Sequence, residues 1–357
     1  MTRTALVAAP QLRDLVAALF VAQGVAPGDA ATVAHCLVEA DLRGVASHGV
    51  GRVPVYLKRL RSGLVAARPV IVVEDVTPVA ARIDGGNGLG FLVARRATAE
   101  AVSRARTYGI GIALARRSNH FGMAASYLRQ AVEAGCAAFV FTNASPAMPI
   151  WGGKVPFLGT SPFAFGAPGG EGTPHLLLDM ATSVVARGKI RRAMVAGEPI
   201  PLGWALDRDG QPTTDAAAAY DGLILPLGGP KGSGLSLMME VLAGVLAGSA
   251  FGGRVGNQYL DDDRPQDVGH MVIALRPDLA VTADEYRRRM AALVARAKAC
   301  PTAEAGGEIL MPGEPEARLE AQRLRDGVPI SAEDAAGLCA EARLAGVALP
   351  AALAGVA

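Results

Sequence analysis

The sequence has few cysteines, few aromatic residues and no long uncharged apolar run. Cysteine occurs four times in 357 residues, at positions 36, 136, 300 and 339, without a C-x-x-C pair. We therefore expect reduced thiols in a cytoplasmic protein rather than a disulfide framework. No stretch reaches the roughly 18 uncharged apolar residues that a membrane span needs. Residues 4–24 have helical periodicity around Arg13 and Asp14, which predicts an amphipathic first helix and no signal peptide.

An excess of one charge and a cluster of histidines are also missing. The net charge is +2 and the basic residues are scattered, so we expect no nucleic-acid partner. The sequence has five histidines: His35, His48, His120, His175 and His270. No two of them share a metal-ligand spacing, and no group of Asp and Glu accompanies them. The sequence therefore predicts no metal site.

What the sequence does contain is a mixed pattern of helices and strands. Helices are predicted over 11–23, 27–43, 51–62, 90–108, 122–135 and 232–252, and strands over 68–85, 109–118, 137–144 and 270–275. The helix at 232–252 is almost wholly apolar, which predicts deep burial. From about residue 283 the chain is helical and charged again. We expect a mixed α/β protein with a helical domain from residues 1–70 and 283–357 and an αβ domain from residues 71–282.

Two glycine-rich stretches resemble nucleotide-binding loops only in part. In D-G-G-N-G-L-G, the third glycine of a G-x-G-x-x-G motif would fall on Phe91, and no acid follows at the ribose position, so an ordinary Rossmann site is not expected. L-G-G-P-K-G-S-G places Lys231 before a helix, which is compatible with an anion site. The same residues would equally make a glycine-rich turn into a buried helix.

The segment A-S-H-G-V-G-R-V-P-V-Y, residues 46–56, gathers side chains suited to acid–base chemistry. If it is helical, His48, Arg52 and Tyr56 lie on one face at a spacing of four residues. Arg52 is suited to grip a carboxylate through two hydrogen bonds, and His48 to exchange a proton near neutral pH. Ser47 is placed to orient the imidazole or to cap the helix. The alternative is a capped helix with an ordinary polar edge.

A second candidate is the turn R-R-S-N-H-F-G-M, where a strand ends and a helix follows. Asn119 and His120 lie in this turn, and such positions often face a ligand at the edge of a sheet. The alternative is a capping or structural histidine. We interpret His35 and His175 as structural, and leave the role of His270 open.

Five segments resemble, in order and spacing, the malate/L-lactate dehydrogenase family of NAD(P)-dependent oxidoreductases, which is unrelated to the Rossmann-fold enzymes. They are D-L-R-G-V-A-S-H-G-V-G-R, R-R-S-N-H-F-G-M, T-N-A-S-P-A-M-P-I-W-G-G, L-L-L-D-M-A-T-S and G-G-P-K-G-S-G-L-S-L. The likeness runs from about residue 5 to about residue 345. It implies a cofactor domain built on a mostly antiparallel sheet, a helical domain from both chain ends, and a homodimer with active sites near the subunit interface.

The resemblance also implies roles for individual residues. Ser47 and His48 match the Ser-His pair of the family, and either His48 or His120 would move the proton. Arg52, Tyr56 and Thr160 would contact the substrate. The residues that match cofactor-binding positions are His120, Phe121, Gly122, Met123, Ala124, Leu178, Asp179, Met180, Lys231, Gly232, Glu308, Ile309, Leu310, Met311, Pro312, Gly313 and Glu314.

The reaction implied is reversible hydride transfer between NAD or NADP and C2 of a small 2-hydroxy or 2-oxo acid, such as malate or lactate. Reduction of a cyclic imino acid is an alternative within the same family. The presence of Arg187 and Lys189, where the imino-acid reductases have an acid, disfavours it. An alternative of another class is a non-catalytic ligand-binding member, which the joint presence of five residues disfavours, namely Ser47, His48, Arg52, His120 and Lys231.

Overall fold

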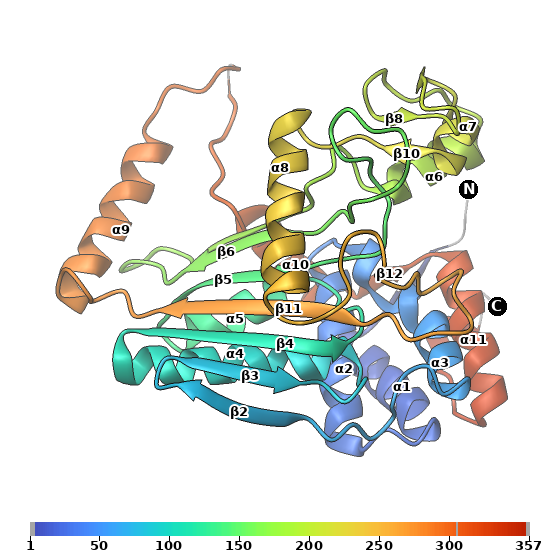
Figure 1. The fold of residues 1–357 in the computed structure, drawn as a ribbon, viewed down its shortest axis with the longest axis horizontal. Helices are drawn as coiled ribbons and strands as arrows, with labels where there is room; N and C mark the ends of the chain where they lie inside the picture. Colours follow the sequence, from blue (N-terminus) through green and yellow to red (C-terminus); the bar gives the residue numbers. More distant parts are fainter. Residues whose placement is uncertain (1–3, 305, 355–357) are drawn as a thin grey trace.

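The computed structural model describes residues 4–304 and 306–354. Its centre is a seven-stranded sheet in the order β2-β3-β4-β11-β5-β6-β7 (Figure 1). The strands are β2 (Val72–Thr77), β3 (Ala80–Asp84), β4 (Ile110–Ser118), β5 (Ala137–Thr142), β6 (Phe163–Ala167), β7 (Leu176–Met180) and β11 (Val268–Leu275). Neighbouring strands are antiparallel except β3 and β4, which are parallel. The expected mixed fold with a mostly antiparallel sheet is therefore confirmed.

Each face of the sheet is covered by different helices. Helices α4 (Gly90–Tyr108) and α5 (Ala125–Glu133) pack on one face, where alanines of α4 allow a close approach to β4. A Cβ at Gly111 would collide with the backbone of Ala101 in α4, so glycine is needed there. The other face is crossed by α8 (Pro230–Met239) and a π-helical turn, η3 (Glu240–Val245). The predicted helix 122–135 begins three residues later than expected, because residues 122–124 complete a turn that lines the cavity described below.

The first and last parts of the chain share a second core. Strand β1 (Ala5–Val7) pairs with β12 (Val328–Ile330), so segments from the first and last parts of the described chain lie side by side (Figure 1). The surrounding helices are α1 (Ala9–Ala22), α2 (Pro27–Leu42), α3 (Val53–Arg61), α10 (Glu314–Asp326), α11 (Ala332–Ala345) and α12 (Ala351–Ala354). Helix starts follow local chemistry: α1, α2 and α3 have proline in the first turn, where its missing N–H costs nothing, and Ser331 caps α11.

Helix α9 (Ala283–Lys298) lies apart from that second core. It extends beside the β6–β7 end of the sheet, where Tyr286 donates a hydrogen bond to the carbonyl oxygen of Pro168 at 2.9 Å. A smaller unit with its own apolar core lies away from α9 (Figure 1). It consists of α6 (Arg187–Ala196), α7 (Ala216–Asp221) and the short strands β8 (Ala205–Leu206), β9 (Pro212–Thr213) and β10 (Leu223–Ile224). We keep the division into residues 1–70 plus 283–357 and residues 71–282 as a proposal.

The prediction of a deeply buried helix at 232–252 is wrong for the single chain. Only one side of α8 and η3 meets the sheet, and the side chains on the other side are open to solvent. Leu237 is 41% exposed, Val241 43%, Val245 51% and Leu246 59%. The apolar composition therefore reflects two apolar faces, of which the fold of one chain covers one. Among the described residues, none of the helices combines the length and hydrophobicity needed to cross a bilayer.

Candidate active site

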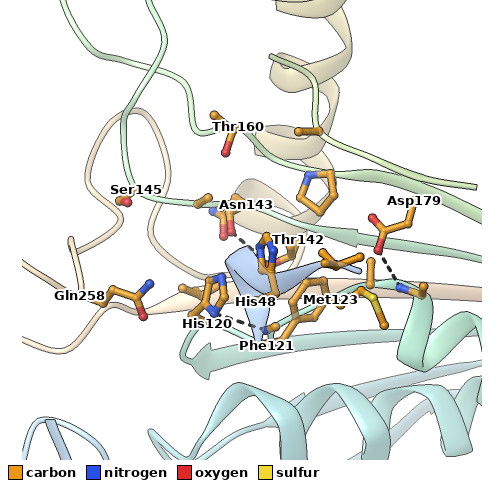
Figure 2. A pocket seen from close by; sticks show the side chains of 18 of the residues that line it. His48, His120, Phe121, Met123, Thr142, Asn143, Ser145, Thr160, Asp179 and Gln258 are labelled. Atoms are coloured by element: carbon orange, nitrogen blue, oxygen red, sulfur yellow. Dashed lines mark hydrogen bonds between the residues drawn. The ribbon is translucent and has the colours of Figure 1, made fainter. Parts of the chain in front are cut away.

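One cavity lies where the end of β4, the end of β5 and the segment after α2 meet (Figure 2). Its wall includes His48, His120 and the turn 121–125, together with Thr160 and Asp179 from strands or loops far along the chain. The fold thus brings together the two histidine segments singled out in the sequence, although 72 positions separate them. Within residues 4–304 and 306–354, no three His, Cys, Asp or Glu side chains form a metal-binding group.

The segment before α3 is not one helix, so the condition under which His48, Arg52 and Tyr56 would share one helical face is not met. It forms two 3₁₀ turns, η1 (Ala46–His48) and η2 (Val50–Arg52), before α3 begins. The buried carboxylate of Asp41 accepts a hydrogen bond from the backbone N–H of Val50 at 2.7 Å, and Gly49 between the turns is extended. A Cβ at Gly49 would collide with that carboxylate. Asp41 and Gly49 therefore set the position of His48.

We expect Gly49→Ala to lower the free energy of unfolding by about 2–4 kcal/mol, because Asp41 must move and lose its hydrogen bond to Val50. Gly28→Ala is the matched control, since a Cβ there meets nothing within 4 Å and Gly28 lies in helix α2. The control should leave stability unchanged or raise it by up to about 1 kcal/mol. Urea denaturation measures both, and equal stabilities of the two variants would contradict this account of the turn.

The rings of His48 and His120 stack on one another in the cavity wall. Their ring centroids are 5.5 Å apart with the planes 14° from parallel. Ser47 Oγ lies 2.9 Å from His48 Nδ1, so Ser47 orients this ring. Burial, helped by the nearby charge of Arg52, lowers the pKa of His48 to about 3. Burial first, and then Arg52, lowers the pKa of His120 well below its usual value. Both rings are therefore neutral at neutral pH.

The tautomer of His120 follows from its partners. Its Nδ1 accepts a hydrogen bond from the backbone N–H of Gly122 at 3.3 Å and lies 2.7 Å from the hydroxyl of Tyr56. Because a backbone N–H can only donate, Nδ1 is the acceptor and the proton of the neutral ring is on Nε2. Tyr56 is not part of the cavity wall, and its hydroxyl contacts the Nδ1 atom of His120. The sequence-based proposal that Tyr56 contacts substrate has no direct support in this geometry.

Arg52 lies beside the two histidines rather than in the cavity wall. Its Nε donates to the carbonyl oxygen of Ser47 at 2.6 Å and its Nη1 to the hydroxyl of Tyr259. The guanidinium carbon is 5.3 Å from the centre of the Tyr259 ring. The charge is thus held close to His48 and His120, and a substrate carboxylate reaches it only by competing with Tyr259.

The far side of the cavity combines apolar and acidic groups. Met123 and Ala124 contribute apolar wall, and Asp179 on β7 accepts a hydrogen bond from the backbone N–H of Ala125 at 2.8 Å. Burial raises the pKa of Asp179 to about 6. The Phe121 ring stacks on the buried ring of His270, with centroids 4.9 Å apart and planes 9° from parallel.

His270, whose role the sequence left open, is a structural residue of the sheet beneath the cavity. Its Nδ1 lies 2.9 Å from Thr142 Oγ1 and its Nε2 lies 2.8 Å from Ser118 Oγ, so the ring joins β4, β11 and β5. Complete burial lowers its pKa to about 3. The ring is therefore neutral and fully hydrogen-bonded in the folded protein.

This pKa predicts acid sensitivity. The unfolded chain binds a proton near pH ~6.5, whereas folded His270 binds one only near pH 3. The contribution of His270 to the free energy of unfolding is therefore complete above pH ~6.5. It falls by about 1.4 kcal/mol per pH unit as the pH decreases from there toward 3. In His270→Gln this contribution is absent, so its unfolding free energy should decline less steeply between pH 6 and pH 4. Denaturant titrations at several pH values measure the slopes, and identical slopes would count against the assignment.

Several residues assigned to the cofactor by resemblance lie outside the cavity wall in the described part of the chain. They are Leu178, Met180, Lys231, Gly232, Glu308, Ile309, Leu310, Met311, Pro312, Gly313 and Glu314. The stretch 308–314 nevertheless runs beside the cavity strand β7, because the carbonyl oxygen of Pro312 accepts from the backbone N–H of Leu177 at 3.0 Å. Lys231 is exposed in the first turn of α8. Their contact with a cofactor stays a prediction.

The structure adds wall residues that sequence reasoning missed, namely Thr142, Asn143, Gln258 and Gln266. Thr142 and Asn143 end the buried strand β5, and polar side chains at a strand end were a usable signal. Gln258 and Gln266 lie in a long connection before β11, where the sequence has no periodic pattern. The backbone N–H of His120 donates to Gln266 Oε1 at 3.1 Å, a contact that only the folded chain creates.

Comparison with known proteins identifies the group to which this fold and cavity belong. Residues 7–339 match the family model described as malate/L-lactate dehydrogenase. The chain belongs to the malate/L-lactate dehydrogenase family. This confirms the expected enzyme class, an NAD- or NADP-dependent oxidoreductase acting on the CH–OH group of a 2-hydroxy acid.

Relatives in this family are similar to this chain in sequence along most of its length. The sequence is 40% identical over 311 residues to the L-sulfolactate dehydrogenase of Methanocaldococcus jannaschii, covering 86% of this chain and 88% of that enzyme. It is 40% identical over 283 residues to the NADP(+)-dependent (2R)-3-sulfolactate dehydrogenase of Chromohalobacter salexigens, covering 79% and 84%. The solved malate dehydrogenase of Pyrococcus horikoshii superposes with a TM-score of 0.89 at 33% identity, covering 98% and 99%.

Proposed function

We propose that this dehydrogenase acts on small 2-hydroxy acids with a second anionic group on C3, of which malate and sulfolactate are examples. The observation that supports proton transfer to or from a small hydroxy acid is the pair of neutral, stacked histidines at a cavity lined by hydrogen-bonding side chains. Relatives named for sulfolactate and for malate share this substrate type. The C1 carboxylate would bind near Arg52, and Thr160 would contact the substrate from the opposite wall.

The residues of the cavity fit a nicotinamide cofactor. Phe121, Met123 and Ala124 form an apolar wall of suitable type for a flat ring, while the carboxylate of Asp179 in the same wall can accept hydrogen bonds from a sugar or a carboxamide. When bound, NAD or NADP supplies or accepts the hydride at C4 of its nicotinamide ring. The protein then has to orient the acid and move one proton.

We assign the proton transfer to His120. Its Nε2–H is the edge left free by Tyr56 and Gly122, so it can donate to the carbonyl oxygen of a 2-oxo acid. As Nε2 releases that proton, Nδ1 can take the hydroxyl proton of Tyr56, and the imidazole stays neutral. Burial raises the pKa of Tyr56, which opposes this transfer, and the charge of Arg52 offsets only part of that rise. His48, held by Ser47, positions the same oxygen.

The test is the initial rate of NADH and NADPH oxidation with oxaloacetate, sulfopyruvate, pyruvate and a cyclic imino acid. We expect turnover with oxaloacetate or sulfopyruvate and a clear preference for one nucleotide. Activity restricted to the imino acid would replace the proposal by the alternative chemistry. Absence of binding and turnover with every compound would favour a non-catalytic member.

We propose that the enzyme is a homodimer and that the exposed side of α8 and η3 belongs to its interface. Contiguous apolar surface of this kind is typical of protein contacts. Replacing Val241 and Val245 together by lysine should convert dimer to monomer in analytical ultracentrifugation. The matched control is Val195→Lys on α6, since Val195 is 75% exposed and lies on another unit. A wild-type chain that is monomeric at micromolar concentration would refute this interface.

We further propose a cytoplasmic location. The cysteines Cys36, Cys136, Cys300 and Cys339 are all free thiols in the structure, which suits a reducing compartment. Cell fractionation of the source organism tests this assignment, and recovery from an oxidising compartment would contradict it.

A further inference from the structure

Residues 253–267, which we call the strap, connect η3 to β11 and contribute Gln258 and Gln266 to the cavity wall. The side chain of Arg59, which is only 1% exposed, fixes the strap from below. Its Nη1 donates to the carbonyl oxygen of Asp261 at 2.8 Å and its Nη2 to that of Arg264 at 2.9 Å. Lys58 and Asp262 add an ion pair at 2.9 Å. Helix α3, which follows the His48 turn, therefore holds the strap in one position.

The strap also contacts both histidine segments. Gln266 accepts from the backbone N–H of His120 through Oε1 and donates to the carbonyl oxygen of Gly256 through Nε2, both at 3.1 Å. Tyr259 holds the guanidinium of Arg52 through its hydroxyl. The position of the strap is thus tied to the residues assigned to proton transfer and to the carboxylate.

Gln258 differs from Gln266 in one decisive respect. Both amides are buried, at 7% and 5% exposure, and both lie in the cavity wall. Gln266 uses both ends of its amide within the protein, whereas the Gln258 amide makes no hydrogen bond with the described residues: its Oε1 is buried without a partner, and its Nε2–H is left to donate toward the cavity. A buried amide without partners is costly, and in native proteins such groups mark a place that a ligand or water completes. Figure 2 shows Gln258 beside His120 at the edge of the cavity.

We propose that Gln258 selects the substrate by hydrogen-bonding the polar group on C3, and that it thereby discriminates malate-like and sulfolactate-like acids from lactate. This rests on the proposed function. Gln258 precedes the residue that holds Arg52, so an acid whose C1 carboxylate is near Arg52 can direct its other end at Gln258. A carboxylate or sulfonate oxygen accepts from the amide Nε2–H, whereas the methyl group of pyruvate leaves the amide unpaired.

The physical basis is the asymmetry of buried hydrogen bonds. A site built to hydrogen-bond a substrate rejects an analogue without that group, because the polar group of the site is left unpaired. Ser145 and Thr160, which also line the cavity, offer further hydroxyl donors to the same oxygens. In Gln258→Leu the rejection of a methyl group is removed, and the bond to the acidic group is lost.

The experiment compares kcat/KM for oxaloacetate and for pyruvate in wild type, Gln258→Leu and Gln258→Glu. We expect the oxaloacetate-to-pyruvate ratio to fall by about tenfold or more in Gln258→Leu, the size of one lost hydrogen bond to a charged group. Gln258→Glu should lower it further, because a second carboxylate repels the dianion. Gln211→Leu, at an exposed position, is the matched control and should leave the ratio unchanged. Equal loss with both substrates, or an unchanged ratio, overturns the proposal.

A binding measurement separates this proposal from the proposed function. Isothermal titration of L-malate and L-lactate, each with saturating NAD, is carried out on the same variants. If wild type turns over no 2-oxo acid, the proposed function fails, while a malate preference that disappears in Gln258→Leu still supports selection by Gln258. If wild type is active and the malate-to-lactate affinity ratio is the same in wild type and Gln258→Leu, the role of Gln258 is refuted and the proposed function stands.

Discussion

Replacing His120 by alanine should lower kcat by a factor of about 10²–10⁴, the usual contribution of a positioned acid–base group. The reason is that Nε2–H of His120 is the donor whose protonation is fixed by the fold, through Gly122 and Tyr56. The binding of the acid should change little, because we propose that its C1 carboxylate binds near Arg52 rather than on this ring. Steady-state kinetics with the substrate found in the first assay measure kcat and KM separately.

Two further variants distinguish proton transfer from positioning. His48→Ala should cost less in kcat than His120→Ala, and its pH profile should keep the wild-type shape. Tyr56→Phe removes the hydroxyl that completes the relay and keeps the ring, which packs on Phe91. It should lower kcat without unfolding the protein. If His48→Ala abolishes activity while His120→Ala retains it, the two roles must be exchanged.

Arg52→Ala should lower kcat/KM for 2-oxo acids. The corresponding loss of transition-state stabilisation should be about 2–5 kcal/mol, the usual loss when one partner of a close charge pair is truncated. We expect the lower part of this range, because the guanidinium is half-exposed and solvent screens it. Most of the loss should appear in KM, since a carboxylate is present in both the ground state and the transition state. Kinetics with a 2-oxo acid and with the corresponding 2-oxo amide measure how much of the loss belongs to the carboxylate.

Two comparisons test whether the charge or the strap is responsible. Tyr259→Phe removes the hydroxyl bonded to Arg52 and leaves the guanidinium free, so it should keep or improve binding of the acid. Arg52→Lys keeps the charge but loses the forked geometry, and should recover only part of the activity. An Arg52→Ala enzyme with unchanged kcat/KM would remove Arg52 from the substrate site.

Local sequence patterns predicted most of the elements near the site. The helix at 90–108 has the predicted bounds, and the strands after it lie close to their predicted positions. They could be predicted because the period of apolar residues reports which side of an element faces the core. The turn around His48 could not, because its two 3₁₀ turns depend on the buried carboxylate of Asp41, which lies on the preceding helix.

The site shows the same division. Residue types and spacing predicted Ser47, His48, Arg52 and His120 as site residues, and the resemblance to a family added Thr160 and Asp179; of these, His48, His120, Thr160 and Asp179 line the cavity. Tyr56 was found as well, but its role as a partner of His120 was not. The strap residues Gln258, Tyr259 and Gln266 gave no local signal, because a loop is positioned by distant contacts, here by Arg59 of α3.

By itself the sequence determined the class of the protein: mixed helices and strands, the two histidine segments and the chemistry that they can support. Composition and periodicity are local properties, and they are legible without a fold. Only the tertiary structure decided which atoms face one another. It placed the rings of His48 and His120 5.5 Å apart, fixed the tautomer of His120 and left the amide of Gln258 without a partner. These features depend on residues far apart in the chain that are brought together when two cores pack around one cavity.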